Sequence, residues 1–364
     1  MSSRNMIFHI SQQLDRQYAS ASQIRPLKMM AAFQSMGYQV DIVEGTAKTR
    51  QEQVRAIKQK VQSGTKYDFV YSESSTMPTL LTERHHLPTH PFLDFGFFHF
   101  CKKNDIPIGL FYRDIHWCFV NKNKDWKQRV ARYFYQYDLK KYKELVDVLF
   151  LPSLEMLPHI PFRFGGEVLP LPPGGDLKNA ARPDLTDTLN LLYVGGVGGN
   201  YDLRPLLKAV AQCPSVRLTV CCRPSDWQSV KDSYSALLSP NVTIVHRTLE
   251  QLPAEYAAAD LFTLFFHGDY WEFAVPFKLF EAVGYGIPMI AAEGTWCGSF
   301  VQTNGIGQTV AWNENALVSV LQQIQQNPSV LKQYQERLAA IAPNNTWESR
   351  ARTVADALTK PKNA

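Results

Sequence analysis

Short apolar runs alternate with longer amphipathic segments along the whole chain. The runs are continuously apolar, which is typical of strands buried on both faces of a parallel sheet. The segments between them repeat apolar residues at helical spacing. This pattern predicts an α/β protein in which helices connect parallel strands. The predicted strands are Met6–Ser11, Tyr38–Val43, Asp68–Tyr71, Pro107–Tyr112, Asp147–Pro152, Leu191–Val194, Leu218–Arg223, Val242–Arg247, Asp260–Phe266 and Pro288–Ala292. The main predicted helices are Arg25–Met36, Thr49–Ser63, Asn121–Leu145, Leu203–Ala211, Leu252–Ala259, Asn315–Gln325, Pro328–Ala340 and Trp347–Leu358.

Length and composition indicate two globular domains. The chain has 364 residues, of which 45% are hydrophobic and 20% charged, and this suits two domains of ordinary size. The Gly- and Pro-rich segment Gly165–Gly175 is interpreted as the hinge. We therefore expect a first domain at 1–170 and a second that begins at 171.

Other global features favour a reduced, cytoplasmic protein. Six cysteines are scattered without a C-x-x-C pair, which argues for free thiols and against a zinc site. The cluster His85, His86 and His90 lies in a Pro-rich loop, and no metal site is predicted there. No apolar run is long enough for a membrane-spanning helix. The N-terminus is too short and polar for a secretory signal.

The stretch Glu272–Ala292 carries the strongest candidate chemistry. It follows one predicted strand and ends in another, with a helix between them. Pro276 suits the first helical position, and the glycines at 284 and 286 suit the helix end. Lys278 and Glu281 are three residues apart and share a helix face. A helix that starts at the carboxyl end of a parallel strand is a place where phosphates bind. The alternative is an ordinary amphipathic helix with a surface ion pair.

Further candidates follow other strands of the second half. The loop after Leu191–Val194 contains Gly196, Gly198 and Gly199, which permit close approach of a phosphate or sugar. The same glycines also suit a tight strand-to-helix turn. After the next strands come Arg223 and His246, and Tyr270 or Trp271 is placed to stack on a base or sugar.

In the first half, Arg113 and Asp114 end a buried strand. Asp114 is the candidate general base or orienting carboxylate, with His116 as the second choice. The alternative is a loop held together by an Arg113–Asp114 ion pair. The polar segment Ser72–Thr76 also ends a strand and suits either hydroxyl binding or a helix start.

Basic and aromatic residues concentrate in the first half. Residues 1–180 carry 24 Lys and Arg against 17 Asp and Glu, and the remainder carries 14 against 16. The predicted helix at 121–145 mixes Lys and Arg with six aromatic residues, which suits an anionic membrane surface. It also suits an ordinary helix with an aromatic core face and a solvated basic face. No nucleic-acid module accompanies it. The segment 85–100 is rich in phenylalanine and is interpreted as core rather than as a membrane contact.

The stretch around Lys278 resembles the donor-binding segment of GT-B glycosyltransferases, especially the bacterial family-4-like enzymes. Their pattern, roughly P-x-K-x-x-E-(A/Y)-x-x-x-G-x-P, stands here as Pro276, Lys278, Glu281, Gly286 and Pro288. The resemblance implies that Glu281 holds the ribose and that Lys278 lies near the phosphates or the sugar. A second glutamate, frequent eight residues earlier in the family, is replaced by Phe273, with Glu272 one residue away.

The resemblance also bears on the glycine loop, which starts as the donor domain of these enzymes often does. Family members often place Arg and Lys in that loop, whereas this chain has neither there. Arg223 is the best-placed replacement, together with Lys278 and the helix start at Val275–Phe277. His246 would lie toward the base, by analogy with the fold.

The resemblance implies a GT-B architecture, with two facing Rossmann-like domains and a C-terminal helix, 346–364, that returns to the first. The second domain then spans 171–345. The implied activity is transfer of a sugar from a nucleotide-diphosphate donor, with a UDP-sugar expected, to a saccharide or lipid-linked saccharide acceptor in polysaccharide or glycoconjugate synthesis. No D-x-D occurs, and no metal or other cofactor is expected. The expected location is cytoplasmic, with peripheral contact at the inner membrane face. The alternatives are a nucleotide-sugar epimerase and an inactive carbohydrate-binding or assembly protein.

Overall fold

The chain folds into two compact units. The computed structural model describes residues 4–15, 21–119, 126–178 and 187–360. Unit 1 consists of residues 1–172 and 347–364, and unit 2 of residues 173–346. Each unit has a six-stranded sheet in which neighbouring strands run parallel. The predicted α/β class with parallel sheets is therefore confirmed.

Unit 1 has the strand order β2-β1-β3-β4-β5-β6. Its strands are β1 Arg4–Ile10, β2 Tyr38–Val43, β3 Phe69–Glu73, β4 Ile108–Phe111, β5 Val148–Leu151 and β6 Glu167–Pro170. Its α-helices are α1 Ala21–Ser35, α2 Ala47–Gln62, α3 Leu93–Lys103, α4 His116–Phe119, α5 Trp126–Leu145 and α13 Trp347–Thr359. Residues 121–125, where the long basic helix was expected to begin, lie outside the described residues.

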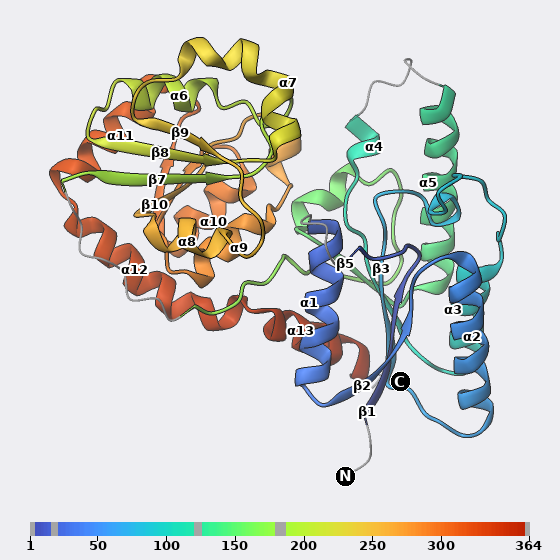
Figure 1. The fold of residues 1–364 in the computed structure, drawn as a ribbon. Coiled ribbons are helices and arrows are strands. Elements are labelled where there is room, and N and C mark those ends of the chain that lie inside the picture. The colour runs from blue at the N-terminus through green and yellow to red at the C-terminus, as the bar shows by residue number, and fades with distance from the viewer. Residues whose placement is uncertain (1–3, 16–20, 120–125, 179–186, 361–364) are drawn as a thin grey trace. The chain divides into compact units, whose positions relative to one another are not determined.

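The C-terminal helix α13 covers a face of the first sheet that the other connections leave open. Right-handed crossovers place α1, which leads to β2, on one face, and α2, α3 and α5, which lead the other way, on the opposite face. Figure 1 shows α13 beside α1, and it packs against α1, β3 and β4. Gly109 on β4 permits the close approach, because a Cβ there would lie 2.7 Å from Leu358.

The Gly- and Pro-rich segment 165–175 is not simply a hinge, as the sequence suggested. Its central part forms β6, which pairs with β5 from Val148↔Glu167 to Leu151↔Pro170. Proline suits the end of this strand, because β6 is an edge strand with one partner. The division between the units follows at Pro172 and Pro173.

Unit 2 has the strand order β12-β11-β10-β7-β8-β9. Its strands are β7 Leu189–Val194, β8 Val216–Cys221, β9 Val242–Val245, β10 Leu261–Leu264, β11 Met289–Ala292 and β12 Gly307–Val310. Its α-helices are α6 Arg204–Ala211, α7 Pro224–Tyr234, α8 Leu252–Ala258, α9 Phe277–Gly284, α10 Trp296–Asn304, α11 Glu314–Gln326 and α12 Ser329–Ile341. From β7 the chain builds outward to β9, and from β10 it builds in the opposite direction. The carboxyl ends of β7 and β10 therefore form a topological switch point, where open α/β sheets bind ligands.

The phenylalanine-rich segment 85–100 is divided between core and surface. Phe95, Phe97 and Phe98 on α3 are buried, as the core interpretation predicts. Phe92, just before the helix, is 82% exposed, so that interpretation is wrong for this residue. In the described parts of the chain, no helix combines the length and apolar character needed to cross a membrane.

A buried carboxyl on α5 gives unit 1 a predictable pH dependence. Asp138 is buried and accepts a hydrogen bond from the Thr79 amide at 2.7 Å. Burial raises the pKa of Asp138 to about 7, although hydrogen bonds from Thr79 act in the opposite direction. The folded state therefore retains a proton that the unfolded chain loses near pH 4, and stability falls as the pH rises from about 4 to 7.

We expect Asp138→Asn to remove this part of the pH dependence, since an amide side chain still accepts from Thr79. Between pH 5 and 8 the wild type should lose about 3 kcal/mol more unfolding free energy than the variant. Urea unfolding at both pH values measures the difference. Glu144→Gln, at an exposed side chain, is the matched control and should retain the wild-type slope. Equal slopes for wild type and Asp138→Asn would contradict the prediction.

Candidate active site

The loop after β7 is a compact glycine turn at the switch point of unit 2. Gly198 and Gly199 have φ of 87° and 56°, which favour glycine. A Cβ at Gly198 would lie 2.5 Å from Val230, and one at Gly196 would lie 3.1 Å from the Tyr201 ring. The glycines are therefore required by packing and backbone conformation, whether or not the loop also binds a phosphate.

A buried tryptophan joins this loop to the one that follows β10. Trp271 is 2% exposed, donates from Nε1 to the Asn200 carbonyl at 3.0 Å and stacks on Phe266 at 4.1 Å. It is therefore not available to stack on a base, as the sequence had suggested as one option. Tyr270 is half-buried, with its ring 5.3 Å from that of Phe273. Tyr270 remains the candidate for ring stacking.

Helix α9 carries the predicted donor-binding pair. Pro276 precedes the helix as its N-cap, rather than being its first residue, and Gly286 adopts the left-handed conformation beyond its end. Lys278 Nζ lies 2.7 Å from Glu281 Oε2, and the two side chains are 23% and 25% exposed. Gly284 lies so close to the Asp176 carbonyl that a Cβ would clash. Helix α9 is thus fixed in unit 2 while Lys278 and Glu281 stay accessible.

Tyr256 on α8 positions Glu281, a role that no local sequence pattern indicated. Its hydroxyl donates to Glu281 Oε2 at 3.0 Å, and its ring stacks on Tyr285 at 4.8 Å. Burial, with the neighbouring Glu281 charge, raises the pKa of Tyr256 well above the ordinary range, so the hydroxyl stays a donor. Both described partners share Oε2, and Oε1 of Glu281 has none among the described residues. That oxygen can accept a hydrogen bond from a ligand hydroxyl.

The other cation candidate lies beyond β8. Arg223 is the N-cap of α7, is 56% exposed and forms an ion pair with Asp226 at 3.2 Å. His246, beyond the adjacent strand β9, has Nδ1 2.8 Å from the Cys222 carbonyl. The carboxyl ends of β8 and β9 therefore bring Arg223 and His246 to the same region. Phe277 is 8% exposed and has Lys278 Nζ 5.4 Å from its ring centroid.

The position of the second glutamate in the family pattern, eight residues before Glu281, is not occupied by a carboxylate here. Phe273, which occupies it, is buried, and Glu272 is exposed beside it. A 3₁₀ turn at Asp269–Glu272 leads into this point. The carboxylate is therefore displaced to the outside, while an aromatic ring fills the corresponding interior position.

Asp114 belongs to unit 1, in the loop after β4. Its Oδ1 accepts from the His116 amide at 3.0 Å, and its side chain is 24% exposed. The preceding Arg113 turns toward β3, where it donates to Glu73 Oε2 at 2.8 Å and to the Ser74 carbonyl at 3.3 Å. Burial lowers the pKa of Arg113. The polar segment after β3 is therefore a structural support for this loop and not a helix start.

Glu73 itself is fully buried and is held by a second arginine. Arg25 Nε lies 3.3 Å from Glu73 Oε1, and the guanidinium stacks on Phe111 at 3.6 Å. The Tyr71 hydroxyl donates to the same oxygen at 3.0 Å. Because removing one partner from a buried ion pair leaves an uncompensated charge, this network fixes the loop that carries Asp114.

The described residues contain no group of three or more His, Cys, Asp or Glu side chains placed to hold a metal ion. The candidate residues thus form one cluster at the β7–β10 switch point, a second near β8 and β9, and Asp114 in unit 1. Their individual roles stay predictions.

Comparison with known proteins finds a family similarity within the second unit. Residues 188–327 match the family described as Glycosyl transferases group 1. No curated protein sequence matches the chain.

Solved structures share the fold over nearly the full length. Sucrose-phosphate synthase from Thermosynechococcus elongatus is 17% identical, with a TM-score of 0.66 over 97% of this chain and 98% of that one. HepE from Anabaena, in complex with UDP, is 14% identical, with a TM-score of 0.68 over 98% and 100%. WaaG, a glycosyltransferase involved in lipopolysaccharide biosynthesis, is 15% identical, with a TM-score of 0.61 over 98% and 100%. These likenesses show that the chain has the GT-B fold, and residues 188–327 within it are similar to the group 1 glycosyl transferases.

Proposed function

We propose that the protein transfers a sugar from a nucleotide-diphosphate donor, a UDP-sugar, to a saccharide or lipid-linked saccharide in polysaccharide or glycoconjugate synthesis. The observation that carries this proposal is the arrangement around Glu281. Lys278 and Tyr256 hold one carboxylate oxygen, and the other can accept from a ribose hydroxyl. HepE, which has a similar fold, was solved with UDP and with UDP-glucose. WaaG, which also has a similar fold, is involved in lipopolysaccharide biosynthesis, and this supports the proposed synthesis of a polysaccharide or glycoconjugate.

The chemistry of transfer explains the choice of cations. As the glycosidic bond breaks, negative charge develops on the leaving diphosphate, and fixed positive groups stabilise it where it grows. Lys278 lies in the first turn of α9, where the helix dipole adds to its charge. Arg223 is our choice for the second cation. One of its partners is the partly exposed Asp226, and such surface pairs are worth about 1 kcal/mol or less.

Other contacts to the donor are assigned by position. The amides of the glycine loop at 196–199 and of the α9 start at Phe277 are placed for the diphosphate or the sugar, since both lie at carboxyl ends of strands. Tyr270 is assigned to ring stacking, and His246 to the neighbourhood of the base. We also propose that no metal or other cofactor takes part, as the resemblance implies.

Asp114 is proposed as the general base of an inverting transfer. It is partly exposed, and the Arg113–Glu73 pair fixes its loop, so it can be held rigidly while it meets an acceptor hydroxyl. The family pattern often has a second glutamate at the position of Phe273. Because this chain lacks that carboxylate, assigning the role of base to Asp114 is consistent with its sequence.

The first prediction from the proposed function concerns donor binding. A nucleotide at ~100 times its dissociation constant should stabilise the wild type by about 2.7 kcal/mol. We expect UDP to raise the melting temperature more than GDP, ADP or dTDP do, and Glu281→Ala to abolish that rise. Differential scanning fluorimetry measures both. Glu336→Ala, at an exposed position on α12, is the control and should respond as the wild type does. A full response in Glu281→Ala would refute the assigned ribose contact.

The second prediction concerns the transfer step. Asp114→Asn should lower sugar transfer by about 10²–10⁴-fold, the usual contribution of a general base, with the UDP-induced shift unchanged. Radiolabelled UDP-sugars and candidate acceptors provide the assay, and product NMR gives the anomeric configuration. Glu52→Gln, at an exposed position in unit 1, should transfer normally. Retention of configuration, or normal transfer by Asp114→Asn, would exclude the base role. Release of an epimerised sugar without acceptor would instead favour an epimerase.

We further propose that α5 contacts an anionic membrane surface. The first part of the helix stands away from the core, with Trp126, Val130 and Tyr133 exposed by 63%, 43% and 66%. These three share one helix face, and Lys127 and Arg129 lie beside them. Farther along, Tyr135, Leu139 and Tyr142 face the core. An exposed apolar row with adjacent cations suits the interfacial region of a bilayer.

The third prediction tests this surface. Trp126→Ser combined with Tyr133→Ser should reduce flotation with vesicles that contain phosphatidylglycerol, because the aromatic side chains no longer enter the interface. Leu249→Ser, at an exposed apolar residue of unit 2, is the matched control. Unchanged flotation of the double variant would contradict the assignment to α5.

A further inference from the structure

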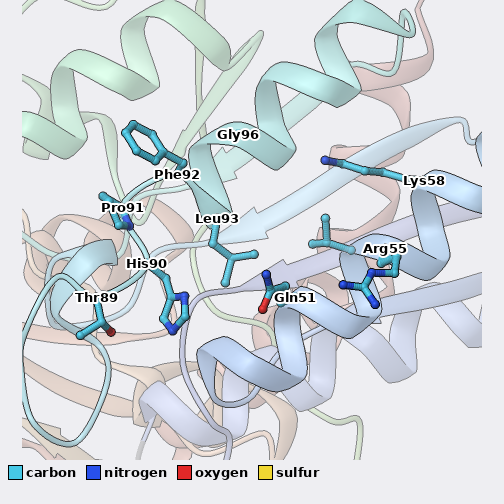
Figure 2. A pocket seen from close by; sticks show the side chains of 10 residues that line it. Gln51, Arg55, Lys58, Thr89, His90, Pro91, Phe92, Leu93 and Gly96 are labelled. Carbon is cyan, nitrogen blue, oxygen red and sulfur yellow. The ribbon is translucent and has the colours of Figure 1, made fainter.

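A groove beside α2 and α3 of unit 1 contains none of the residues assigned to the proposed transfer reaction. It has a volume of about 540 Å³ and lies between α2 and the start of α3. Figure 2 shows Gln51, Arg55 and Lys58 of α2 on one side and Thr89, His90 and Leu93 on the other. Its volume is within the range of small-molecule sites.

Most polar side chains of this groove have no polar partner in the described parts of the chain. Among the described residues, the side chains of Gln51, Arg55 and His90 have no hydrogen bond or ion pair. The ammonium of Lys58 contacts only the Phe100 ring, at 5.2 Å. The residues that line the groove include no carboxylate.

Of the acidic residues close to the groove in sequence, Glu52 is exposed on α2, whereas Asp94 and Glu83 are engaged inside unit 1. Asp94 accepts from Arg50 at 3.0 and 3.1 Å and from His9 at 3.0 Å, and Glu83 accepts from the Ala47 amide at 2.6 Å. The two lining cations, Arg55 and Lys58, exceed the single exposed carboxylate, Glu52, on this stretch of α2. The groove therefore has a net positive charge, and its complement is an anion.

Large apolar side chains stand exposed at its rim. Phe92 is 82% and Leu87 is 58% exposed, both in the segment that leads into α3. Phe92 is among the residues that line the groove, but in Figure 2 its ring points away from Gln51 and Arg55. A saccharide bound in the groove would leave this ring in water. A bilayer would instead receive the ring while a headgroup entered the groove.

We propose that this α2–α3 groove binds the phosphate of an anionic phospholipid headgroup, with Phe92 and Leu87 entering the adjoining acyl region. The proposal rests on the proposed contact of unit 1 with a membrane and adds a specific lipid site to it. Helix α3 packs on α5, with Phe95 and Tyr137 rings 5.7 Å apart. The groove and the exposed row of α5 thus belong to the same helical layer (Figure 1).

The test is flotation of the full-length protein with phosphatidylcholine vesicles, with or without phosphatidylglycerol. Each cation near an anionic surface multiplies the partition coefficient by about five. Arg55→Ser combined with Lys58→Ser should therefore lower partition to anionic vesicles roughly 25-fold, and Phe92→Ser should lower it independently. Lys66→Ser with Lys360→Ser removes the same charge from exposed sites outside the groove and should have a much smaller effect, because charges beyond a Debye length of about 8 Å are screened.

The outcomes separate this proposal from the others. Equal losses in the groove and control pairs would indicate general charge attraction and overturn the lipid site. If only the α5 variant lost vesicle binding, the lipid site would be overturned but the proposed membrane contact would stand. If the wild type did not bind vesicles, both the lipid site and the membrane contact would be overturned. Competition by an acidic polysaccharide with no vesicle binding would replace the lipid with a saccharide. UDP-induced stabilisation, measured on the same variants, should be unchanged, so failure of donor binding is detected separately.

Discussion

Both units depend on one constraint, which is that a parallel sheet must be covered on its two faces. In unit 2 the chain satisfies it by building outward from β7 and then from β10 in opposite directions, and this reversal creates the switch point where Glu281 and the glycine loop lie. In unit 1 only α1 follows the reverse direction. The remaining surface over β3 and β4 is covered by α13. The return of the C-terminal helix and the position of the proposed donor site thus have the same physical origin.

Within this frame, buried charge positions the loops that the sheets leave free. Glu73 ends β3 with no exposure of its side chain and is shared by Arg25 and Arg113. Desolvation makes such a network costly, and removing one partner costs more than the intact pair contributes. Its value here is geometric, because Arg113 directly precedes Asp114. In unit 2, Tyr256 has a similar positioning role, because its buried phenol donates a hydrogen bond that orients Glu281.

The sequence predicted the architecture well because its information is local and periodic. Apolar runs such as Leu261–Leu264 are buried at every position, and the Lys278–Glu281 spacing placed both residues on one helix face. Tyr256 and Glu73 were not identified, since their roles depend on contacts across 25 and 40 residues of sequence. Trp271 was assigned partly to a ligand because an aromatic residue in a loop looks the same whether it faces a base or the core. The segment 165–175 contains the division between the units, but the sequence did not reveal the edge strand within it, because proline at an edge strand resembles proline in a linker.

The Lys278–Glu281 pair shows why the environment, rather than the pair itself, distinguishes a site from a surface contact. A lysine and a glutamate three residues apart on an exposed helix contribute little to stability. Here both side chains are about three-quarters buried, and the third member, Tyr256, donates from the core. Two donors on one oxygen orient the carboxylate, and its second oxygen has no partner among the described residues. A nucleotide can then bind Glu281 without breaking the ion pair, and the ammonium stays beside the position where a diphosphate would carry its charge.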